Sequence, residues 1–110
     1  MKCVGMTLNL KDDPEVIRRY KQYHRAVWPE VLASAHRKGM NKSRIFLLGR
    51  RLFFYFEVPD DYDPVSDLEP DPNPRCKEWD DIMRDLQEKV PEAKAEEWWA
   101  EMELVFSEDA

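Results

Sequence analysis

The sequence is poor in the residues on which several common kinds of active site depend. It has three glycines, two cysteines and two histidines among 110 residues. Three scattered glycines form no glycine-rich phosphate loop, and no serine lies in a nucleophile elbow. Two distant histidines and two isolated cysteines make no zinc motif. We therefore expect no metal and no cofactor, which leaves acid–base side chains as the means of any catalysis.

Long apolar runs and an excess of positive charge are also absent. No stretch approaches the ~18 apolar residues of a membrane span, and the first residues lack the ~7 to 15 apolar residues of a signal peptide. Lys and Arg number 17 against 23 Asp and Glu, so the net charge of −6 disfavours nucleic acid as a partner. Cys3 and Cys76 form no CxxC pair, which fits a reducing compartment. These features predict a soluble cytoplasmic protein that binds neither membranes nor nucleic acid.

The composition that remains is that of one folded domain. Hydrophobic residues make up 43% of the chain and aromatic residues 12%, which is enough to build a core. A length of 110 residues is typical of one domain and leaves no room for a second. We therefore treat residues 1–110 as a single domain.

The first part of the chain predicts a strand followed by a helical region. Residues Lys2 to Leu10 alternate between apolar and polar side chains, as in a half-buried strand. Asp12-Asp13-Pro14 is typical of a helix start, and Gly39 of a helix end. Pro29 interrupts the pattern and predicts a kink or a restart. The apolar positions between these limits recur at helical spacing and are Val16, Tyr20, Tyr23, Val27, Val31 and Ala35.

Two apolar runs in the middle of the chain predict a hairpin. They are Ser43 to Leu48 and Arg51 to Val58, separated only by Gly49-Arg50. In the second run one face carries apolar residues, and the opposite face carries Phe53, Tyr55 and Glu57. A carboxylate therefore stands in line with two aromatic rings.

The rest of the chain predicts a loop, a helix and a final strand. Pro59 to Pro74 is acidic and rich in proline, as in a long loop or a lid. Helical spacing returns from Arg75 and ends at Pro91, and Glu101 to Phe106 alternates like a strand. The order β-α-β-β-α-β is that of a ferredoxin-like α+β fold. Aromatic residues on both faces of the second hairpin strand predict that two sheets stack as a dimeric α+β barrel.

His24 and Glu57 are the candidate catalytic residues. His24 lies on the apolar stripe one turn from Tyr20 and from Trp28, and an imidazole exchanges protons near neutral pH. The alternative for His24 is a hydrogen-bonded core histidine. Glu57 interrupts an apolar strand where the fold has no need of an acid. Its alternatives are a solvated position or an ion pair with Arg44.

Two residues of the second long helix are candidate ligand contacts. Trp79 would supply an apolar wall and Asp80 a hydroxyl acceptor, a pairing suited to the mixed faces of a sugar. Packing in the core is the alternative for Trp79.

The stretch from Tyr20 to Val31 resembles the helix motif of the L-rhamnose mutarotase family, Tyr-x-x-x-His-x-x-x-Trp-Pro-Glu. Further similar segments follow the same order along the chain: Gly5-Met6, Ile45-Phe46-Leu47, Phe56-Glu57-Val58, Trp79 and Glu103-Leu104-Val105-Phe106. The resemblance implies a homodimeric α+β barrel that interconverts the α and β anomers of 6-deoxy-hexopyranoses without a cofactor. It also implies that His24 is the proton donor and that Tyr20 contacts the sugar.

Two positions depart from the pattern of this family. Ser43 stands where the family commonly has a tyrosine, and Trp79-Asp80 where it commonly has two tryptophans, both being sugar-contacting positions. The side chains that hydrogen-bond to the sugar hydroxyls determine which epimer fits the site. The two differences from the family pattern therefore predict the same reaction on another sugar. We prefer L-fucose, which differs from L-rhamnose at C2 and C4. The other hypotheses are a cofactor-independent monooxygenase, a haem-degrading protein, and a sugar-binding module without activity.

Overall fold

The structure is a computed structural model, and residues 1–62 and 71–109 are described. Their helices and strands follow in chain order: β1 (Lys2–Leu10), α1 (Pro14–His24), α2 (Pro29–Arg37), β2 (Asn41–Leu48), β3 (Arg51–Val58), α3 (Pro74–Leu86), β4 (Gln87–Glu88) and β5 (Ala100–Met102). The central part of the predicted loop or lid lies outside the described residues.

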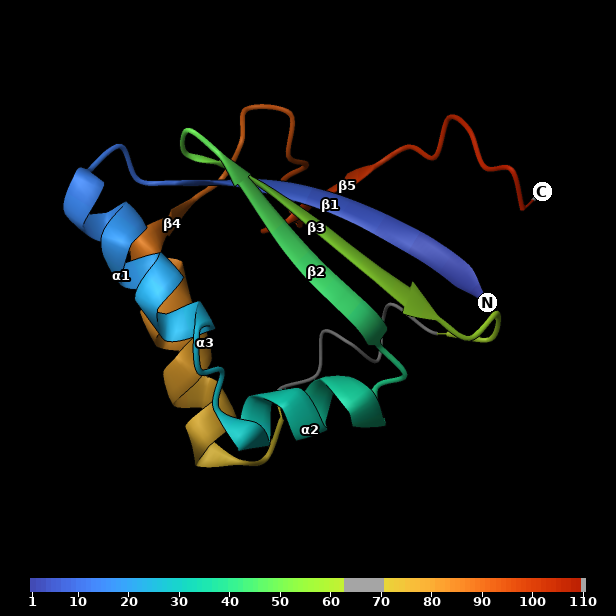
Figure 1. Ribbon diagram of the computed structural model, residues 1–110, viewed down its shortest axis with the longest axis horizontal. Helices are drawn as coiled ribbons and strands as arrows, with labels where there is room; N and C mark the ends of the chain where they lie inside the picture. The colour runs from blue at the N-terminus through green and yellow to red at the C-terminus, as the bar shows by residue number, and fades with distance from the viewer. Residues whose placement is uncertain (63–70, 110) are drawn as a thin grey trace.

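The strands form one antiparallel sheet with β1 at its centre. On one side β1 pairs with β3, which pairs with β2; on the other side β1 pairs with β4 and with β5. The three helices lie together on one side of this sheet (Figure 1). We call the side that they cover the helix face, and the other side the open face. This arrangement confirms the predicted ferredoxin-like α+β fold.

Local signals in the sequence set the ends of the helices. The side chain of Asp13 accepts a hydrogen bond from the backbone N–H of Glu15 at the start of α1, and a proline begins each of the three helices. Gly39 has a φ of 93° just after α2, a conformation that favours glycine. The predicted restart at Pro29 is confirmed, because α1 ends at His24 and α2 begins at Pro29.

Two predicted boundaries in the second half are wrong. α3 ends at Leu86 and not near Pro91, because Gln87 takes an extended backbone and pairs with Leu10 of β1. The last strand covers Ala100–Met102 only, whereas the sequence predicts one that continues to Phe106. Alternation of apolar and polar side chains makes a segment able to form a strand, but the segment must also pair with the edge of another strand. The apolar side chains of residues 104–106 are exposed.

The core lies between the helix face and the helices. Side chains from β1, β3, α1 and α3 meet there in one buried cluster made up of Leu10, Tyr20, Leu52, Trp79, Met83 and Leu86. Because side chains of a strand alternate between faces, Leu52, Phe56 and Val58 of β3 point toward the helices. Residues 53, 55 and 57 therefore point to the open face.

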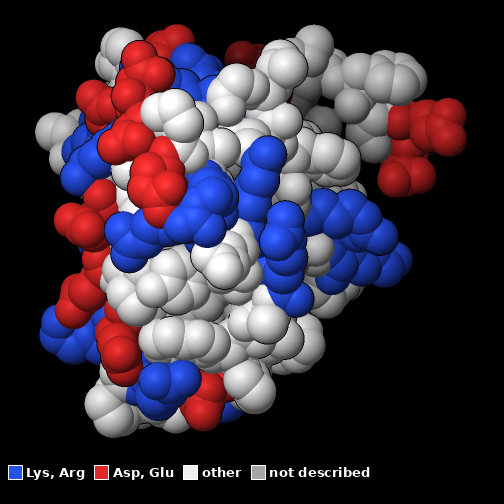
Figure 2. Space-filling view, turned by 60° about the vertical axis from the view of Figure 1, so that its left-hand side comes forward, with Lys and Arg blue, Asp and Glu red and all other residues white. Residues whose placement is uncertain are grey.

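Charges of both signs share the side of the molecule on which α1 and α3 lie. In Figure 2, which turns this side forward, acidic side chains line the left-hand edge, and basic ones lie across the middle and the right. Ion pairs on the helices, such as Arg18 with Glu15 and Lys77 with Asp81, belong to neighbouring helical turns. No helix within residues 1–62 and 71–109 is long and apolar enough to cross a membrane.

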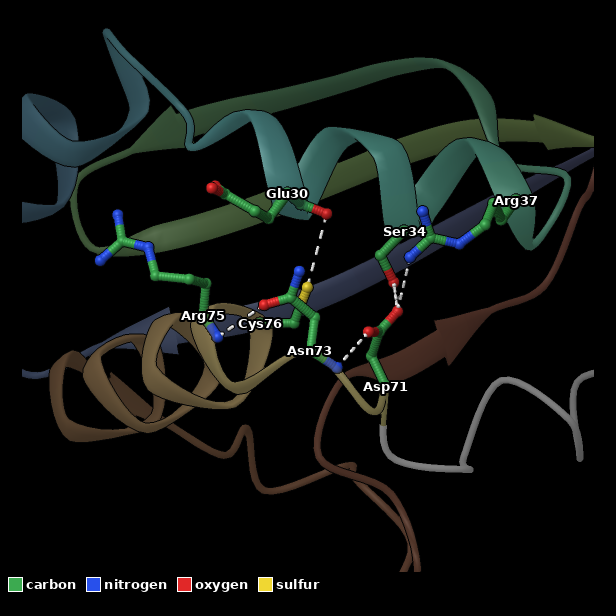
Figure 3. Close-up of polar contacts among 7 residues, drawn as sticks. All are labelled: Glu30, Ser34, Arg37, Asp71, Asn73, Arg75 and Cys76. Carbon is green, nitrogen blue, oxygen red and sulfur yellow. Dashed lines mark hydrogen bonds and ion pairs between the residues drawn. The ribbon is translucent and has the colours of Figure 1, made fainter.

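The Asp71 carboxylate ties the start of α3 to α2. Its Oδ2 accepts hydrogen bonds from Ser34 Oγ at 2.6 Å and from Arg37 Nη2 at 3.0 Å, and its Oδ1 accepts one from the Asn73 backbone N–H at 2.8 Å (Figure 3). The hydrogen bond from Ser34 is the largest of the causes that hold the pKa of Asp71 down at about 2. Because α3 carries Trp79, this contact helps to fix the position of that ring.

Replacing Asp71 with asparagine should lower the stability of the fold at neutral pH and remove part of its acid sensitivity. The pKa of Asp71 is depressed from 3.8 to about 2, so its stabilising effect is present above pH 4 and is lost as the pH falls toward 2. Urea unfolding of both proteins between pH 7 and pH 2 should give curves that converge at the acid end. The exposed Asp61→Asn variant is the control, and a difference that persists unchanged at pH 2 would contradict this account.

Candidate active site

Five aromatic side chains from α1, α3 and the α1–α2 connection meet at one end of the core. We call them the ring cluster: Tyr20, Tyr23, His24, Trp28 and Trp79. Tyr20 and His24 stack at 4.2 Å between ring centroids, with an interplanar angle of 28°. Trp79 presents T-shaped contacts to Tyr23, His24 and Trp28 at 5.9, 5.3 and 5.2 Å. Geometries of this kind are favourable for aromatic pairs.

The sequence brings these rings together by simple spacing. Tyr20 and His24 are four residues apart and share one side of α1. Trp28 immediately precedes the new helix at Pro29, and the Arg75 guanidinium lies 3.8 Å from the centre of its ring. Tyr20 and Trp79 are buried, whereas His24 and Trp28 are half-buried. The ring cluster is therefore anchored in the core and still reaches solvent.

One ring nitrogen of His24 makes a hydrogen bond within the protein, and the other is available to a ligand. Nδ1 lies 2.9 Å from the backbone carbonyl oxygen of Tyr20. A carbonyl only accepts, so Nδ1 must donate, and in the neutral ring the lone pair is then on Nε2. Burial lowers the pKa of His24, and the hydrogen bond to the Tyr20 carbonyl opposes part of that change. The described residues give Nε2 no hydrogen-bond partner, so it is placed to exchange a proton with a ligand.

Tyr20 carries a buried hydroxyl beside this imidazole. Burial raises the pKa of Tyr20, so the phenol stays protonated, and a hydrogen bond from Gln87 acts in the opposite direction. Gln87 is 5% exposed, and its Oε1 accepts a hydrogen bond from the Trp98 indole at 2.8 Å. Sequence reasoning missed Gln87. The available signal was a glutamine eight residues after Trp79 and four after Met83, on the apolar side of the predicted helix.

Glu57 lies on the other side of the sheet from His24. Its Oε2 accepts a hydrogen bond from the Tyr55 hydroxyl at 2.9 Å, and its Oε1 lies 3.7 Å from Lys42 Nζ. The ion-pair partner is thus Lys42, and the alternative that predicted Arg44 is wrong. Tyr55 and Glu57 point to the open face, whereas His24 packs on the helix face. One copy of the chain therefore does not bring the two candidate catalytic residues together.

The remaining candidate residues are exposed. Ser43 lies in β2 beside a register shift between Asn41 and Arg44, and Asp80 lies in the second turn of α3 directly after Trp79. Neither belongs to the buried cluster around Trp79. Of the predicted site residues, the structure thus joins Tyr20, His24, Trp28 and Trp79, and it leaves Ser43, Asp80 and Glu57 outside that group.

A hollow of about 530 Å³ lies on the open face, away from the ring cluster. Its walls include Cys3, Gly5, Phe53, Tyr55 and Met102. It holds no imidazole, and its surface continues into the stacked pair of Phe46 and Phe53, whose ring centroids are 6.2 Å apart. Within residues 1–62 and 71–109 there is no group of three or more His, Cys, Asp or Glu residues that could hold a metal ion. The ring cluster is therefore the stronger candidate for acid–base chemistry.

A ferredoxin-like domain with an imidazole and a phenol set among tryptophans is suited to acid–base chemistry on a small polar ring with apolar faces. The family model described as L-rhamnose mutarotase matches residues 3–108. The chain belongs to the L-rhamnose mutarotase family. Membership of this family supports an isomerase-type enzyme that acts on a sugar.

Individual relatives match nearly the whole chain. A UPF0734 protein of Dictyostelium discoideum is 41% identical over 98% of this chain and 90% of its own length. An L-fucose mutarotase of Xanthomonas campestris is 36% identical over 97% of this chain and 88% of its own length. The crystal structure of an L-rhamnose mutarotase from Formosa agariphila superimposes with a TM-score of 0.69 and 21% identity, covering 97% of this chain and 98% of that one. That crystal structure supports the fold.

Proposed function

We propose that the protein is a cofactor-independent mutarotase that interconverts the α and β anomers of a 6-deoxy-hexose, with L-fucose preferred to L-rhamnose. The observation that carries the proposal is the half-buried imidazole of His24, whose Nδ1 is committed to a carbonyl and whose Nε2 is available. Two free cysteines, Cys3 and Cys76, support a place in the reducing cytoplasm.

Opening of the pyranose ring needs two proton transfers. One proton reaches the ring oxygen, and the anomeric hydroxyl gives one up, so that the C1–O5 bond breaks and an aldehyde forms. We assign the first transfer to the protonated form of His24, which carries a hydrogen on Nε2 as well as on Nδ1, and the second to a water molecule, because Glu57 points to the open face. Rotation about C1–C2 and reclosure on the other face reverse both transfers, so no proton is gained or lost.

The rings around His24 suit the shape of such a sugar. A 6-deoxy-hexose has an apolar patch of C–H groups and a methyl group, and tryptophan faces are suited to such patches. Trp79 lies beside His24 at 5.3 Å between ring centroids, and Trp28 lies beside Trp79 at 5.2 Å, so these two rings would supply such faces. Tyr20 adds a hydroxyl that stays protonated and can donate to a ring substituent.

The test of this function is anomeric exchange measured by saturation-difference NMR on L-fucose and on L-rhamnose with micromolar protein. We expect faster exchange for both sugars than in buffer, and a larger acceleration for L-fucose. A sugar-induced rise in melting temperature without faster exchange would instead indicate a binding module. Equal rates with and without protein, and no thermal shift, would reject the proposal.

The preference for L-fucose depends on the position next to Trp79. Replacing Asp80 with tryptophan should shift the ratio of exchange rates toward L-rhamnose, by about tenfold, because an acceptor of hydroxyl hydrogen bonds is exchanged for an apolar ring. The same NMR measurement on both sugars reads this ratio. Asp81→Trp on the exposed side of α3 is the matched control. An unchanged ratio in Asp80→Trp would remove Asp80 from the account of specificity.

We also propose that the working form is a homodimer joined through the open face. That face exposes large apolar side chains, including Phe46 at 58%, Phe53 at 37% and Met102 at 48%. Leu104 and Val105 line the hollow on this face and are exposed, and Phe106, which follows them, is exposed as well. A single soluble chain rarely exposes so continuous an apolar surface, and a second copy would cover it.

Replacing Phe46 with lysine should weaken this dimer. In light scattering coupled to gel filtration, the wild type should give about twice the 13.2 kDa of one chain. Phe46→Lys should shift the mass toward one chain, because a buried charge without a partner is costly at an interface. Leu32→Lys, at an exposed position of α2, should keep the wild-type mass. A wild type that stays at 13.2 kDa at high concentration would contradict the homodimer.

A further inference from the structure

Residues 103–106, which we call the C-terminal segment, have the alternation of a strand but pair with no strand in the part of the chain that the structure describes. The last strand, β5, ends at Met102, and in Figure 1 the chain runs on from it beyond the sheet. Leu104, Val105 and Phe106 are 62%, 89% and 80% exposed. An exposed apolar segment of this kind is suited to joining the edge of a sheet elsewhere.

β2 lacks the opposite element, a neighbour for its outer edge. Among the described residues it lies at the end of the sheet and pairs only with β3. Its open-face side chains Phe46 and Leu48 are 58% and 85% exposed. β3 and β1 stand between β2 and β5, so the C-terminal segment of the same chain begins about 14 Å away, at roughly 4.8 Å per strand. A second copy can bring a C-terminal segment to this edge.

The charges on β2 and around the C-terminal segment are opposite in sign. β2 contains two basic and no acidic residues, whereas residues 100–106 contain two acidic and no basic ones. They are Lys42 and Arg44 in β2, and Glu101 and Glu103 in the other stretch. Within residues 1–62 and 71–109, no ion pair involves Arg44, Glu101 or Glu103. These three exposed charges are therefore unmatched in a single copy.

The charges distinguish two ways of stacking the open faces around a two-fold axis. With the axis along the strands, the β2 side of each copy lies over the β5 side of the other copy. With the axis across the strands, β2 lies over β2. The second arrangement sets one basic edge against another, whereas the first sets it against Glu101 and Glu103.

We propose that the C-terminal segment of each copy lies along the outer edge of β2 in the other copy, with Glu103 facing Arg44. The inference rests on the homodimer proposed above and gives it one arrangement. Leu104 and Phe106 would then cover apolar side chains that β2 exposes in a single copy. The segment gains the neighbouring strand that it lacks in its own chain, and β2 is no longer an edge.

Two charge reversals test this arrangement. Arg44→Glu and Glu103→Arg should each raise the Kd of the dimer about tenfold, because like charges then face each other. An equal mixture of the two variants should dimerise as the wild type does, since each copy supplies the opposite charge at both contacts. Lys21→Glu and Glu92→Arg, exposed and matched in their change of charge, should keep the wild-type Kd.

The first readout is the molar mass by light scattering over a dilution series, for each variant alone and for the mixture. Wild-type Kd values in both Arg44→Glu and Glu103→Arg would overturn the inference, and so would weakened variants that the mixture does not restore. In either case a dimeric wild type would leave the proposed homodimer standing. A wild type that stays monomeric would overturn both. Because no sugar is present, these outcomes are separate from the test of mutarotation.

The second readout is amide hydrogen exchange of the C-terminal segment. Its amides should exchange more slowly in the wild-type dimer than in Glu103→Arg at the same concentration, because strand pairing protects them. Glu103 lies outside the helices and strands, so this variant tests the inference even if Arg44→Glu does not fold. Equally fast exchange in the dimeric wild type and in Glu103→Arg would overturn the proposed position of the segment.

Discussion

Replacing His24 with asparagine should slow anomeric exchange by about 10²- to 10⁴-fold, the usual contribution of a positioned acid–base group. Asparagine is close in size to the near half of the imidazole, but its amide does not take up or release a proton near neutral pH. The Nε2 atom to which we assign the proton transfer disappears with the ring, while Tyr20, Trp28 and Trp79 remain. Saturation-difference NMR on L-fucose measures the rate directly.

His36→Asn is the matched control for this experiment. His36 lies exposed in the last turn of α2, so its loss should leave the exchange rate at the wild-type value. A folded His24→Asn protein that equilibrates the anomers as fast as the wild type would mean that another group supplies the proton. In that event Tyr20, which stacks on the same imidazole, would be the next candidate.

Replacing Trp79 with alanine should destabilise the fold by about 3–5 kcal/mol, the range found for large aromatic residues in cores. Trp79 is 6% exposed and contacts Tyr23, His24 and Trp28 edge to face, so its removal leaves a cavity where α1 and α3 meet. Urea unfolding followed by circular dichroism should show a lower midpoint at nearly unchanged slope.

Asp85→Ala, on the exposed side of the same helix, is the control for Trp79→Ala. Surface substitutions of this kind change stability by about 0.5 kcal/mol or less. If Trp79→Ala unfolded at the wild-type midpoint, Trp79 would not hold α3 against α1. The ring cluster would then lack the rigid wall on which the proposed sugar contacts depend.

Those parts of the fold that depend on local signals could be predicted from the sequence. Alternation over Lys2–Leu10, the hairpin around Gly49-Arg50 and the restart at Pro29 all follow from neighbouring residues. The end of α3 could not be predicted, because Gln87 leaves the helix to pair with Leu10, far away in the chain. Strand pairing of this kind is decided by tertiary structure and leaves no periodic signal.

The residues of the candidate site also divide into those that local sequence signals reveal and those that only the tertiary structure reveals. Tyr20 and His24 could be grouped from their spacing, because helical geometry alone puts residues four apart on one side, whereas Trp28 follows the end of α1 and joins the group through its contact with Trp79. Glu57 looked catalytic because it interrupts an apolar strand, but the sequence does not say which face of that strand the helices cover. The structure puts the helices on the other face and gives Glu57 a structural pairing with Tyr55 and Lys42.

The central claim is that this chain catalyses mutarotation, and the most direct measurement starts from crystalline α-L-fucose freshly dissolved in buffer. The approach to the equilibrium mixture of anomers is followed by ¹H NMR with and without wild-type protein. A catalyst changes the rate and leaves the equilibrium alone, so we expect a faster approach, proportional to protein concentration, to the same anomer ratio. An approach as slow as in buffer, for L-fucose and for L-rhamnose alike, would contradict the account.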